Sequence, residues 1–293
     1  MSKFDYKGVG VALITPFNAD GSVDFGALGR MMDSVIDGGV DYIVALGTTA
    51  ETPAIVQDER EAIARYIKSL NNNRVPLVIG IGGNCTKEVI DAIVRFDLRG
   101  FDAVLSVAPY YNRPSQEGIY QHYKAISQAS PLPIILYNVP SRTGVNISAE
   151  TTLRLAQLPN IIGIKEASGN MEQIRTILRD KPEEFFVLSG DDSLTLDIMD
   201  EGGLGVISVA ANCFPKSFCG MIHNQLKGNK EEARAMEARL MPAMKMLFEE
   251  GNPTGVKSAL YAKGLIQPYL RLPMIIGSEG LINRLKVAVE ENE

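Results

Sequence analysis

Lys165 is the residue whose type and position point most clearly to chemistry. It ends the apolar run 161–164, and the alternation of side chains along a strand puts Gly163 and Lys165 on one face, with isoleucines on the other. If the isoleucines meet outer helices, the lysine points inward, with a glycine beneath it leaving room. Burial lowers the pKa of a lysine, and its neutral amine then attacks ketones. We therefore predict a Schiff base between Lys165 and a small keto acid. The alternative is a lysine that extends to solvent or pairs with Glu166.

Hydroxyl groups follow two other apolar runs and are suited to moving protons near such an amine. Tyr137 ends run 134–137, and because the chain has only two histidines, a phenol is a candidate acid–base group. Taken alone, Tyr137 fits equally well a tyrosine that caps the core and bonds to backbone. Thr48 and Thr49 follow a glycine and offer hydroxyls and backbone N–H groups to a small carboxylate, although Gly-Thr-Thr by itself favours a plain turn.

Other polar residues carry weaker signals. Arg142 follows a proline turn and is able to hold a carboxylate through two charge-assisted hydrogen bonds, with simple solvation as the alternative. Asp191 and Asp192 have no third ligand nearby, so we interpret them as a helix N-cap and expect no metal site. The glycines in 80–83 lack the third glycine and the acidic partner of a dinucleotide loop. We interpret His122 as structural.

The composition excludes several classes of function. The chain has 293 residues, 45% hydrophobic and 22% charged, which is ordinary for a globular protein. Its formal net charge is −6 and no basic stripe stands out, so we expect no nucleic-acid partner. No apolar run reaches the ~18 residues of a membrane span, and the start lacks a signal-peptide pattern. Three widely spaced cysteines without a C-x-x-C pair predict reduced thiols in a cytoplasmic protein.

Eight short apolar runs, alternating with amphipathic stretches, must position these residues. The runs are 9–14, 42–46, 77–81, 103–107, 134–137, 161–164, 185–188 and 205–209. A spacing of ~20 to 35 residues fits one strand and one crossover helix each time, and runs that are apolar on both faces fit a parallel sheet covered by helices. We predict an α/β fold, a (β/α)8 TIM barrel, with an open doubly wound sheet as the lesser alternative. In such barrels the active site lies where strands end, which is where the residues above fall.

Helical patterns fill the gaps between the runs and continue after the last one. Asn170 and Asn229 each precede a Gln or Glu by three residues, which is the spacing of a capping box. Asn252-Pro253 predicts a helix with Pro at its first position. Apolar periodicity predicts further helices at 25–36, 88–98 and 279–289. No linker precedes the helical tail, so we expect a single domain, 1–293, made of a barrel (1–224) and a C-terminal helical extension (225–293) packed on it.

Longer motifs around these residues resemble the pyruvate-dependent Schiff-base aldolase family across essentially the whole chain. The motifs are GTTAE at 47–51, PYYNRPSQEG at 109–118, YNVPSRTG at 137–144, GIKEASG at 163–169 and SGDD at 189–192. Several long motifs in the right order are a specific signal, unlike any one of them alone.

The resemblance implies that Lys165 forms an imine with pyruvate. Tyr137, Thr48 and Tyr111 match the family's proton relay, in which Tyr111 reaches in from a neighbouring subunit across a dimer interface. The family is usually homotetrameric, so the resemblance also implies a homotetramer.

The same resemblance assigns substrate contacts and a reaction. Thr49, together with Thr48, is expected to bind the pyruvate carboxylate, and Ile207 to present its backbone carbonyl near the imine. Arg142 is expected to bind the carboxylate of a second substrate, L-aspartate 4-semialdehyde. The enamine attacks that aldehyde, the ring closes, and the lysine is released. The implied reaction is a lyase-type condensation in diaminopimelate and L-lysine biosynthesis that needs neither metal nor cofactor.

Two departures from the family pattern have consequences. Ala50 replaces the usual glycine of GTTGE, which stiffens the loop without removing a reactive group. Gln57 and Arg60 stand where lysine-sensitive members carry histidines, and Arg60 is a permanent cation that repels an effector's ammonium group. We therefore expect weak or absent feedback by L-lysine. The remaining residues of this effector site match the family: Asn84, Glu88 and Tyr110.

Three other functions compete with this interpretation. A sister enzyme cleaving a keto-deoxy sugar acid or sialic acid shares the lysine and tyrosine, but Arg142, the tyrosine pair 110–111 and Thr rather than Ser at position 48 disfavour it. A non-catalytic keto-acid sensor would not need the lysine, tyrosine and threonine together. A phosphate-binding barrel needs a glycine-rich loop after the last two runs, and the sequence there is poor in glycine.

Overall fold

Eight strands form a closed barrel in chain order. The computed structural model describes residue 4 and residues 6–292. The strands are β1 (Gly8–Ala12), β2 (Tyr42–Ala45), β3 (Leu77–Gly80), β4 (Ala103–Val107), β5 (Ile134–Asn138), β6 (Ile161–Glu166), β7 (Phe186–Ser189) and β8 (Gly205–Ser208). Their order around the barrel is β1 to β8, and the neighbours pair in parallel. Every apolar run became a strand, so the predicted TIM barrel is confirmed and the open sheet is wrong.

Helices follow the strands as expected. The longer ones are α1 (Phe25–Asp37), α2 (Gln57–Asn71), α3 (Thr86–Arg95), α4 (Gln116–Ala129), α6 (Ala149–Leu155), α7 (Met171–Asp180), α9 (Pro215–Leu226), α10 (Lys230–Met246), α11 (Thr254–Ala262) and α12 (Glu279–Asn292). Short turns are η1 (Thr48–Ala50), η2 (Thr52–Ala54), α5 (Pro140–Thr143), η3 (Asp192–Leu194), α8 (Thr195–Asp200) and η4 (Ala210–Asn212). Among the described residues, no helix combines the length and apolar character needed to cross a lipid bilayer.

The chain divides into two compact units by its internal contacts. The first, the lysine unit, runs from Pro76 to Ile207 and holds β3 to β7 and all of β8 except Ser208. The second, the threonine unit, holds Gly8–Val75 and the described residues from 208 to 292. The expected boundary between 224 and 225 lies inside α9, and the single-domain organisation stays a prediction.

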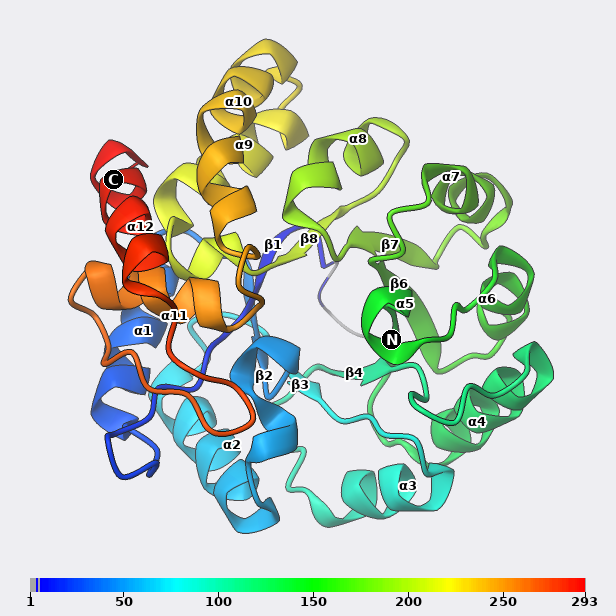
Figure 1. The fold of residues 1–293 in the computed structure, drawn as a ribbon. Helices are drawn as coiled ribbons and strands as arrows, with labels where there is room; N and C mark the ends of the chain where they lie inside the picture. The colour runs from blue at the N-terminus through cyan, green and yellow to red at the C-terminus, as the bar shows by residue number, and fades with distance from the viewer. Residues whose placement is uncertain (1–3, 5, 293) are drawn as a thin grey trace. The chain divides into compact units, whose positions relative to one another are not determined.

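In the lysine unit, helices α3, α4, α6 and α7 follow one another around the outside of the strands (Figure 1). A glycine in β6 allows close packing inside this unit. Gly163 pairs in register with Phe186 of β7, and a Cβ at Gly163 would come within 2.3 Å of the Phe186 ring. The glycine therefore makes room for an aromatic ring in the barrel wall.

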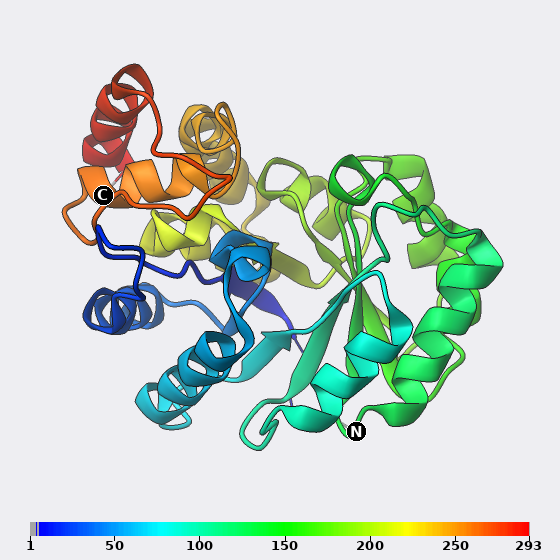
Figure 2. The same ribbon diagram turned by 60° about the horizontal axis from the view of Figure 1, so that its bottom comes forward.

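The threonine unit also has a strand glycine that makes room for an aromatic ring. The same unit contains the C-terminal helices. Gly10 of β1 pairs with Tyr42 of β2, and a Cβ on Gly10 would lie 2.1 Å from the Tyr42 ring. Helices α11 and α12 lie side by side (Figures 1 and 2). The apolar face of α1, expected from its periodicity, is buried through Met31, Met32 and Val35.

Helix ends differ from the sequence predictions in detail. Asn170 caps α7 by accepting from the Gln173 N–H at 3.1 Å, but the Asn170 N–H donates to Ser168 and not to the Gln173 side chain, so only half of the capping box forms. Asn229 precedes α10 without a side-chain cap bond and donates to Asn224 instead. Pro253 lies at the N-cap of α11, one position before the expected one. Helix α3 ends three residues earlier than expected, because Phe96 is extended.

We predict that Gly163→Ala destabilises the protein by about 1–3 kcal/mol, because the added methyl group forces the Phe186 ring to move within a filled barrel wall. Gly26→Ala is the matched control. Its Cβ would meet Asp24 at an ordinary 3.4 Å, and alanine in α1 should stabilise by up to ~1 kcal/mol. Urea unfolding of both variants measures the difference. A Gly163→Ala protein as stable as the unmodified chain would contradict this account of the packing.

Candidate active site

Lys165 lies near the end of β6 and is 5% exposed. The register with β5 shifts at Ile134/Ile135, so that β6 carries one extra residue before Gly163. After this bulge the strand alternates regularly, and Lys165 pairs with Tyr137 of β5 and Leu188 of β7. The predicted inward lysine is therefore a buried one.

The space along the lysine side chain comes from a different glycine than expected. Gly163 faces the Phe186 ring, whereas a Cβ on Gly190, directly after β7, would lie 3.0 Å from Cε of Lys165. The Gly190 N–H donates to the Glu166 carbonyl at 2.7 Å, which holds that loop against β6. Any larger residue at position 190 would crowd the amine-bearing carbon.

The electrostatic surroundings of Lys165 favour its neutral form. Burial lowers the pKa of Lys165 to about 8; the negative charge of Asp192 raises it and the positive charge of Arg142 lowers it. With a pKa of about 8, roughly a tenth of the amines are neutral at pH 7, against about 0.04% for free lysine. Lys165 is thus a competent nucleophile toward a carbonyl carbon.

Tyr137 stands beside the amine, as predicted. It is a largely buried residue of β5, and Nζ of Lys165 lies 4.4 Å from the centre of its ring. The ring face shields the amine from water, and its negative quadrupole interacts favourably with the protonated form. The structure brings the two residues together in one register pair, which sequence spacing alone does not require.

The alternative pairing of Lys165 with Glu166 is wrong. Glu166 is fully buried and points the other way, where its carboxylate accepts hydrogen bonds from Asn138 Nδ2 at 3.1 Å, the Ser168 N–H at 2.7 Å and Gln173 Nε2 at 3.0 Å. Burial raises the pKa of Glu166, and these hydrogen bonds oppose the shift. Asn138 follows Tyr137 directly, so this network ties β5 to β6 at the level of the reactive pair.

The loops after β4 and β5, together with strand β8, supply the remaining candidates of the lysine unit. Arg142 lies on α5 with an exposed side chain, close enough for its charge to act on Lys165. Tyr111 is 88% exposed, has a φ of 75°, and its N–H donates to the Thr143 carbonyl at 3.3 Å. Ile207 is buried in β8.

The two aspartates after β7 have different roles. Asp191 caps η3 by accepting from the Ser193 N–H at 2.9 Å, which confirms the N-cap prediction for this residue. Asp192 is buried and its charge acts on Lys165, a relation that the sequence did not indicate. Among the residues that the structure describes, no three His, Cys, Asp or Glu side chains gather as metal ligands would.

In the threonine unit, Thr48 and Thr49 form the turn η1 directly after β2. Thr49 is buried, and its Oγ1 accepts a hydrogen bond from Asn252 Nδ2 at 3.0 Å. Residues with positive φ flank the turn, Leu46 at 54° and Glu51 at 59°, so its backbone is strained. Ala50 lies in the right-handed part of the turn, where an alanine needs no glycine-like conformation.

The residues of the expected effector site fall in both units. Tyr110, Asn84 and Glu88 are surface or half-buried residues of the lysine unit. In the threonine unit, Arg60 donates through Nε to the Ile55 carbonyl at 2.7 Å and through Nη2 to the Thr52 carbonyl at 2.8 Å.

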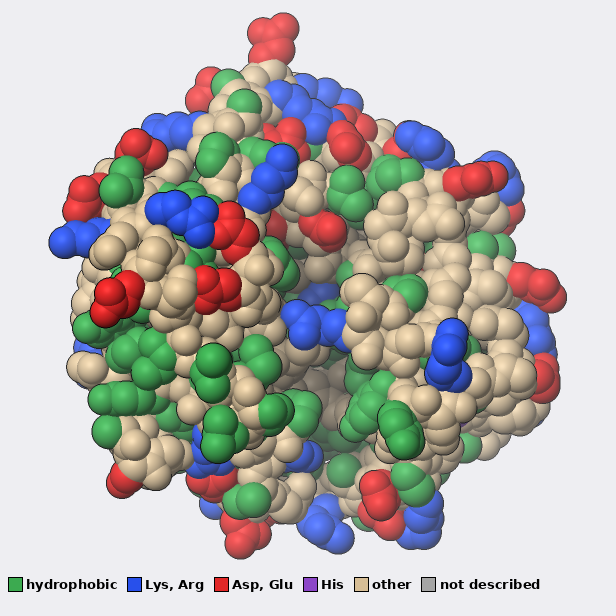
Figure 3. All heavy atoms as spheres, in the orientation of Figure 1, with side chains coloured by type: hydrophobic (Ala, Val, Ile, Leu, Met, Phe, Trp, Pro, Cys, Tyr) green, Lys and Arg blue, Asp and Glu red, His purple; other side chains and the backbone are tan. Residues whose placement is uncertain are grey.

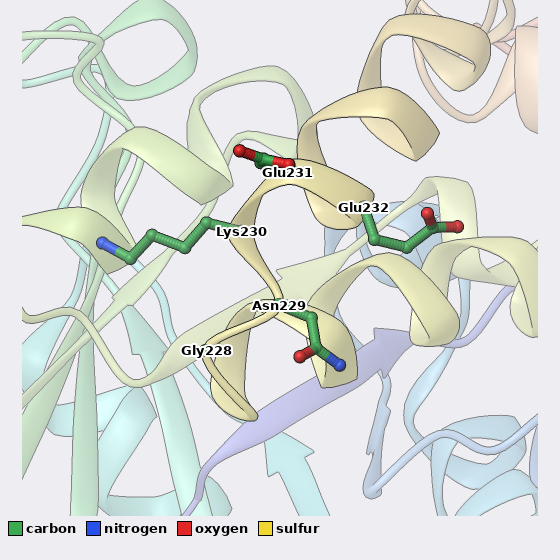
Figure 4. Close-up of a pocket in the computed structure, with 5 residues that line it drawn as sticks. All are labelled: Gly228, Asn229, Lys230, Glu231 and Glu232. Carbon is green, nitrogen blue, oxygen red and sulfur yellow. The ribbon is translucent and has the colours of Figure 1, made fainter.

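Three other features do not contribute to this site. His122 is buried and shares a 2.9 Å hydrogen bond with Thr86, and burial lowers its pKa to about 4, which supports a structural role. A surface hollow lies at the α9–α10 turn, residues 228–232, where the side chains point apart (Figure 4). Positive and negative side chains are interspersed on the face shown in Figure 3.

Sequence reasoning missed Gly190, Asp192 as a neighbour of the amine, and Asn252. In the sequence, the SGDD motif indicated a helix N-cap and contributed to the family resemblance, but it did not indicate a relation to Lys165. Asn252 is 203 positions from Thr49, so no local spacing could connect them.

The chain is similar to known proteins over nearly its whole length. The model of the dihydrodipicolinate synthetase family matches residues 5–292. The chain is 50% identical to the 4-hydroxy-tetrahydrodipicolinate synthase of Parabacteroides distasonis, over 94% of this chain and 93% of that one. Dihydrodipicolinate synthase from Thermotoga maritima has a TM-score of 0.95 at 39% identity, covering 99% of both chains. The chloride-inhibited enzyme from Acinetobacter baumannii complexed with pyruvate has a TM-score of 0.94 at 38% identity, covering 98% of both.

We predict that acetylation of Lys165 by a trace of acetic anhydride rises with pH through about 8 and levels off above it, because only the neutral amine reacts. Asp192→Asn should move the midpoint to lower pH, since it removes a charge that raises the pKa. Arg142→Met should move it to higher pH. Peptide mass mapping measures the rates, with N-acetyl-lysine in the same tube as reference. Midpoints that coincide with that of the reference would contradict the assigned environment.

Proposed function

The chain belongs to the dihydrodipicolinate synthetase family, and on that premise we propose that Lys165 condenses pyruvate with L-aspartate 4-semialdehyde through a Schiff base. The chain is an enzyme, a lyase of the aldolase type, with the activity of 4-hydroxy-tetrahydrodipicolinate synthase in lysine and diaminopimelate biosynthesis. The observation that carries the Schiff-base mechanism is the buried amine of Lys165, whose pKa of about 8 leaves it partly neutral.

The reaction begins when the neutral amine attacks the keto carbon of pyruvate. A C–N bond forms, the keto oxygen leaves as water, and the cationic imine makes the methyl protons acidic. Loss of one proton gives an enamine, whose carbon attacks the aldehyde carbon of the second substrate. The amino group of that substrate then attacks the imine carbon, closes the ring and displaces Lys165.

Protons must move at the keto oxygen, the methyl carbon and the aldehyde oxygen. We assign these transfers to Tyr137, Thr48 and Tyr111. The place of the Tyr137 ring beside the amine supports this assignment. The high exposure of the Tyr111 ring supports its contribution to a neighbouring subunit of a homotetramer.

The substrate carboxylates need donors. We assign the pyruvate carboxylate to Thr49 and Thr48, whose turn presents hydroxyl and backbone N–H groups. Arg142, a cation at the end of α5, is assigned to the carboxylate of L-aspartate 4-semialdehyde. Ile207 presents its carbonyl near the imine. These contacts need no metal ion or organic cofactor, and we place the reaction in the cytoplasm.

The rival function is cleavage of a keto-deoxy sugar acid or sialic acid by the same imine. Arg142 favours the smaller, charged aldehyde, because a guanidinium matches a carboxylate better than a polyhydroxyl chain. Supplying pyruvate with L-aspartate 4-semialdehyde, and separately with N-acetylmannosamine, distinguishes the two functions.

We predict that borohydride reduction in the presence of pyruvate leaves a stable adduct on Lys165, and that Lys165→Ala removes it. Lys257 is an internal control, because its pKa is also lowered to about 8 by burial but its amine pairs with Glu51 at 2.5 Å. Mass mapping of tryptic peptides should therefore find the adduct on Lys165 and none on Lys257. An adduct elsewhere, or none at all, ends the proposal.

Tyr137→Phe should lower kcat by roughly 10²–10⁴-fold, because a general acid–base group is removed while the ring remains. Pyruvate trapping at Lys165 should slow as well. A coupled assay of turnover gives kcat. Trapping reactions stopped at successive times give the rate at which pyruvate is trapped on Lys165. Unchanged turnover would remove Tyr137 from the relay.

We further predict weak or absent inhibition by L-lysine. The guanidinium of Arg60 donates to the carbonyls of Ile55 and Thr52, and we expect its permanent positive charge to repel the ammonium group of L-lysine. Arg60→His together with Gln57→His should strengthen the response. Steady-state rates over a lysine titration test this, and micromolar inhibition of the unmodified chain would refute it.

A further inference from the structure

Asn252, the residue before Pro253 in the C-terminal segment, makes a buried contact with the turn η1. Its Nδ2 donates to Thr49 Oγ1 at 3.0 Å. Asn252 is 5% exposed and Thr49 is 2% exposed, and both belong to the threonine unit. Water cannot replace either partner of a hydrogen bond between two buried side chains. Such a bond therefore restricts the orientation of both groups.

The chemistry of the two groups fixes the direction of this bond. An amide nitrogen only donates, so the Thr49 oxygen must accept from it. A hydroxyl has one proton, which is then left for a different acceptor. A carboxylate is an acceptor without protons at neutral pH, so it is the natural partner for a hydroxyl prepared in this way.

We propose that Asn252 is a positioning residue for pyruvate, because it orients the Thr49 hydroxyl so that its proton points to the substrate carboxylate. This inference rests on the proposed function, in which Thr49 binds that carboxylate. Asn252 acts through Thr49 and has no part in proton transfer or imine chemistry.

A second tie holds the same turn to the same C-terminal segment. Lys257 of α11 is fully buried and pairs with Glu51 at 2.5 Å, and its Nζ also donates to the Tyr269 carbonyl at 3.0 Å. The Arg271 N–H donates to the other Glu51 oxygen at 3.0 Å. Glu51 ends the turn that contains Thr49, so Asn252 before α11 holds the turn at Thr49, while α11 and the loop after it hold the turn at Glu51. The position of the Thr49 side chain is therefore held by contacts within the fold itself.

Asn252→Asp tests the proposal most sharply, because it keeps the shape and reverses the hydrogen bond. The carboxylate accepts the Thr49 proton and repels a substrate carboxylate nearby. We expect KM for pyruvate to rise about ten- to hundredfold, with a much smaller change in kcat. Asn252→Ala, which only removes the donor, should raise KM by about tenfold or less. The alanine variant also supplies the test if the aspartate variant does not fold.

Asn71→Asp is the matched control. Asn71 is a 3% exposed asparagine at the end of α2, and its amide donates to the Val75 carbonyl at 2.7 Å. The same chemical change there should lower the melting temperature and leave KM for pyruvate unchanged. A loss of affinity in Asn252→Asp that merely reports lower stability would appear in this control too, and would overturn the proposal.

A double-mutant cycle separates positioning from general damage. In a Thr49→Val background the hydroxyl is gone, so Asn252→Ala, which removes the donor without adding a charge, should change KM little further. An equal rise of KM in both backgrounds, or no rise in a folded Asn252→Asp protein, overturns the proposal.

Borohydride trapping distinguishes this failure from failure of the proposed function. The unmodified chain should trap pyruvate on Lys165, and Asn252→Asp should do so only at higher pyruvate concentrations. If the unmodified chain traps pyruvate and the variant has the same concentration dependence, only the positioning role is lost. If the unmodified chain traps none, the function and the role of Asn252 are both overturned.

Discussion

The chemistry of this protein depends on one amine that the fold removes from water. Lys165 is 5% exposed at the end of a barrel strand, and burial lowers its pKa to about 8. Removing a charge from water costs more than most single contacts return, so a lysine in this position is stable only where its neutral form is tolerated. The desolvation that destabilises the charged form of Lys165 also leaves part of the amine neutral, and the neutral amine is the reactive form.

The surrounding structure keeps that amine in one place. A glycine after β7 leaves room for the lysine side chain, and the Tyr137 ring covers it from the neighbouring strand. On the opposite face of the same strands, Asn138 and Glu166 are joined by hydrogen bonds and fix the register between β5 and β6. Side-chain alternation thus gives each of these strands a reactive face and a supporting face. Asp192 and Arg142 have opposing effects on the lysine pKa.

The sequence was sufficient to predict the features that depend on apolar periodicity and on the residues at the ends of strands. All eight strands, the inward lysine and the tyrosine beside it followed from apolar runs and the alternation of side chains. It could not predict which glycine makes room for the lysine, because Gly163 and Gly190 are equally visible in the sequence and only packing shows that the first faces Phe186. The contact between Asn252 and Thr49 joins residues 203 positions apart, a relation that depends on the tertiary fold. The capping box predicted at Asn229 does not form, because the Asn229 side chain donates to Asn224 instead.

The most direct test of the central claim is a titration of the Lys165 amine itself. Nitrogen-15 NMR of lysine-labelled protein, with the signal assigned through Lys165→Arg, follows the side-chain nitrogen as the pH changes. A midpoint near 8, well below the ~10.4 of free lysine, is the predicted result. A midpoint at the free-lysine value would mean that the amine remains charged at neutral pH, and the Schiff-base mechanism would then have no nucleophile.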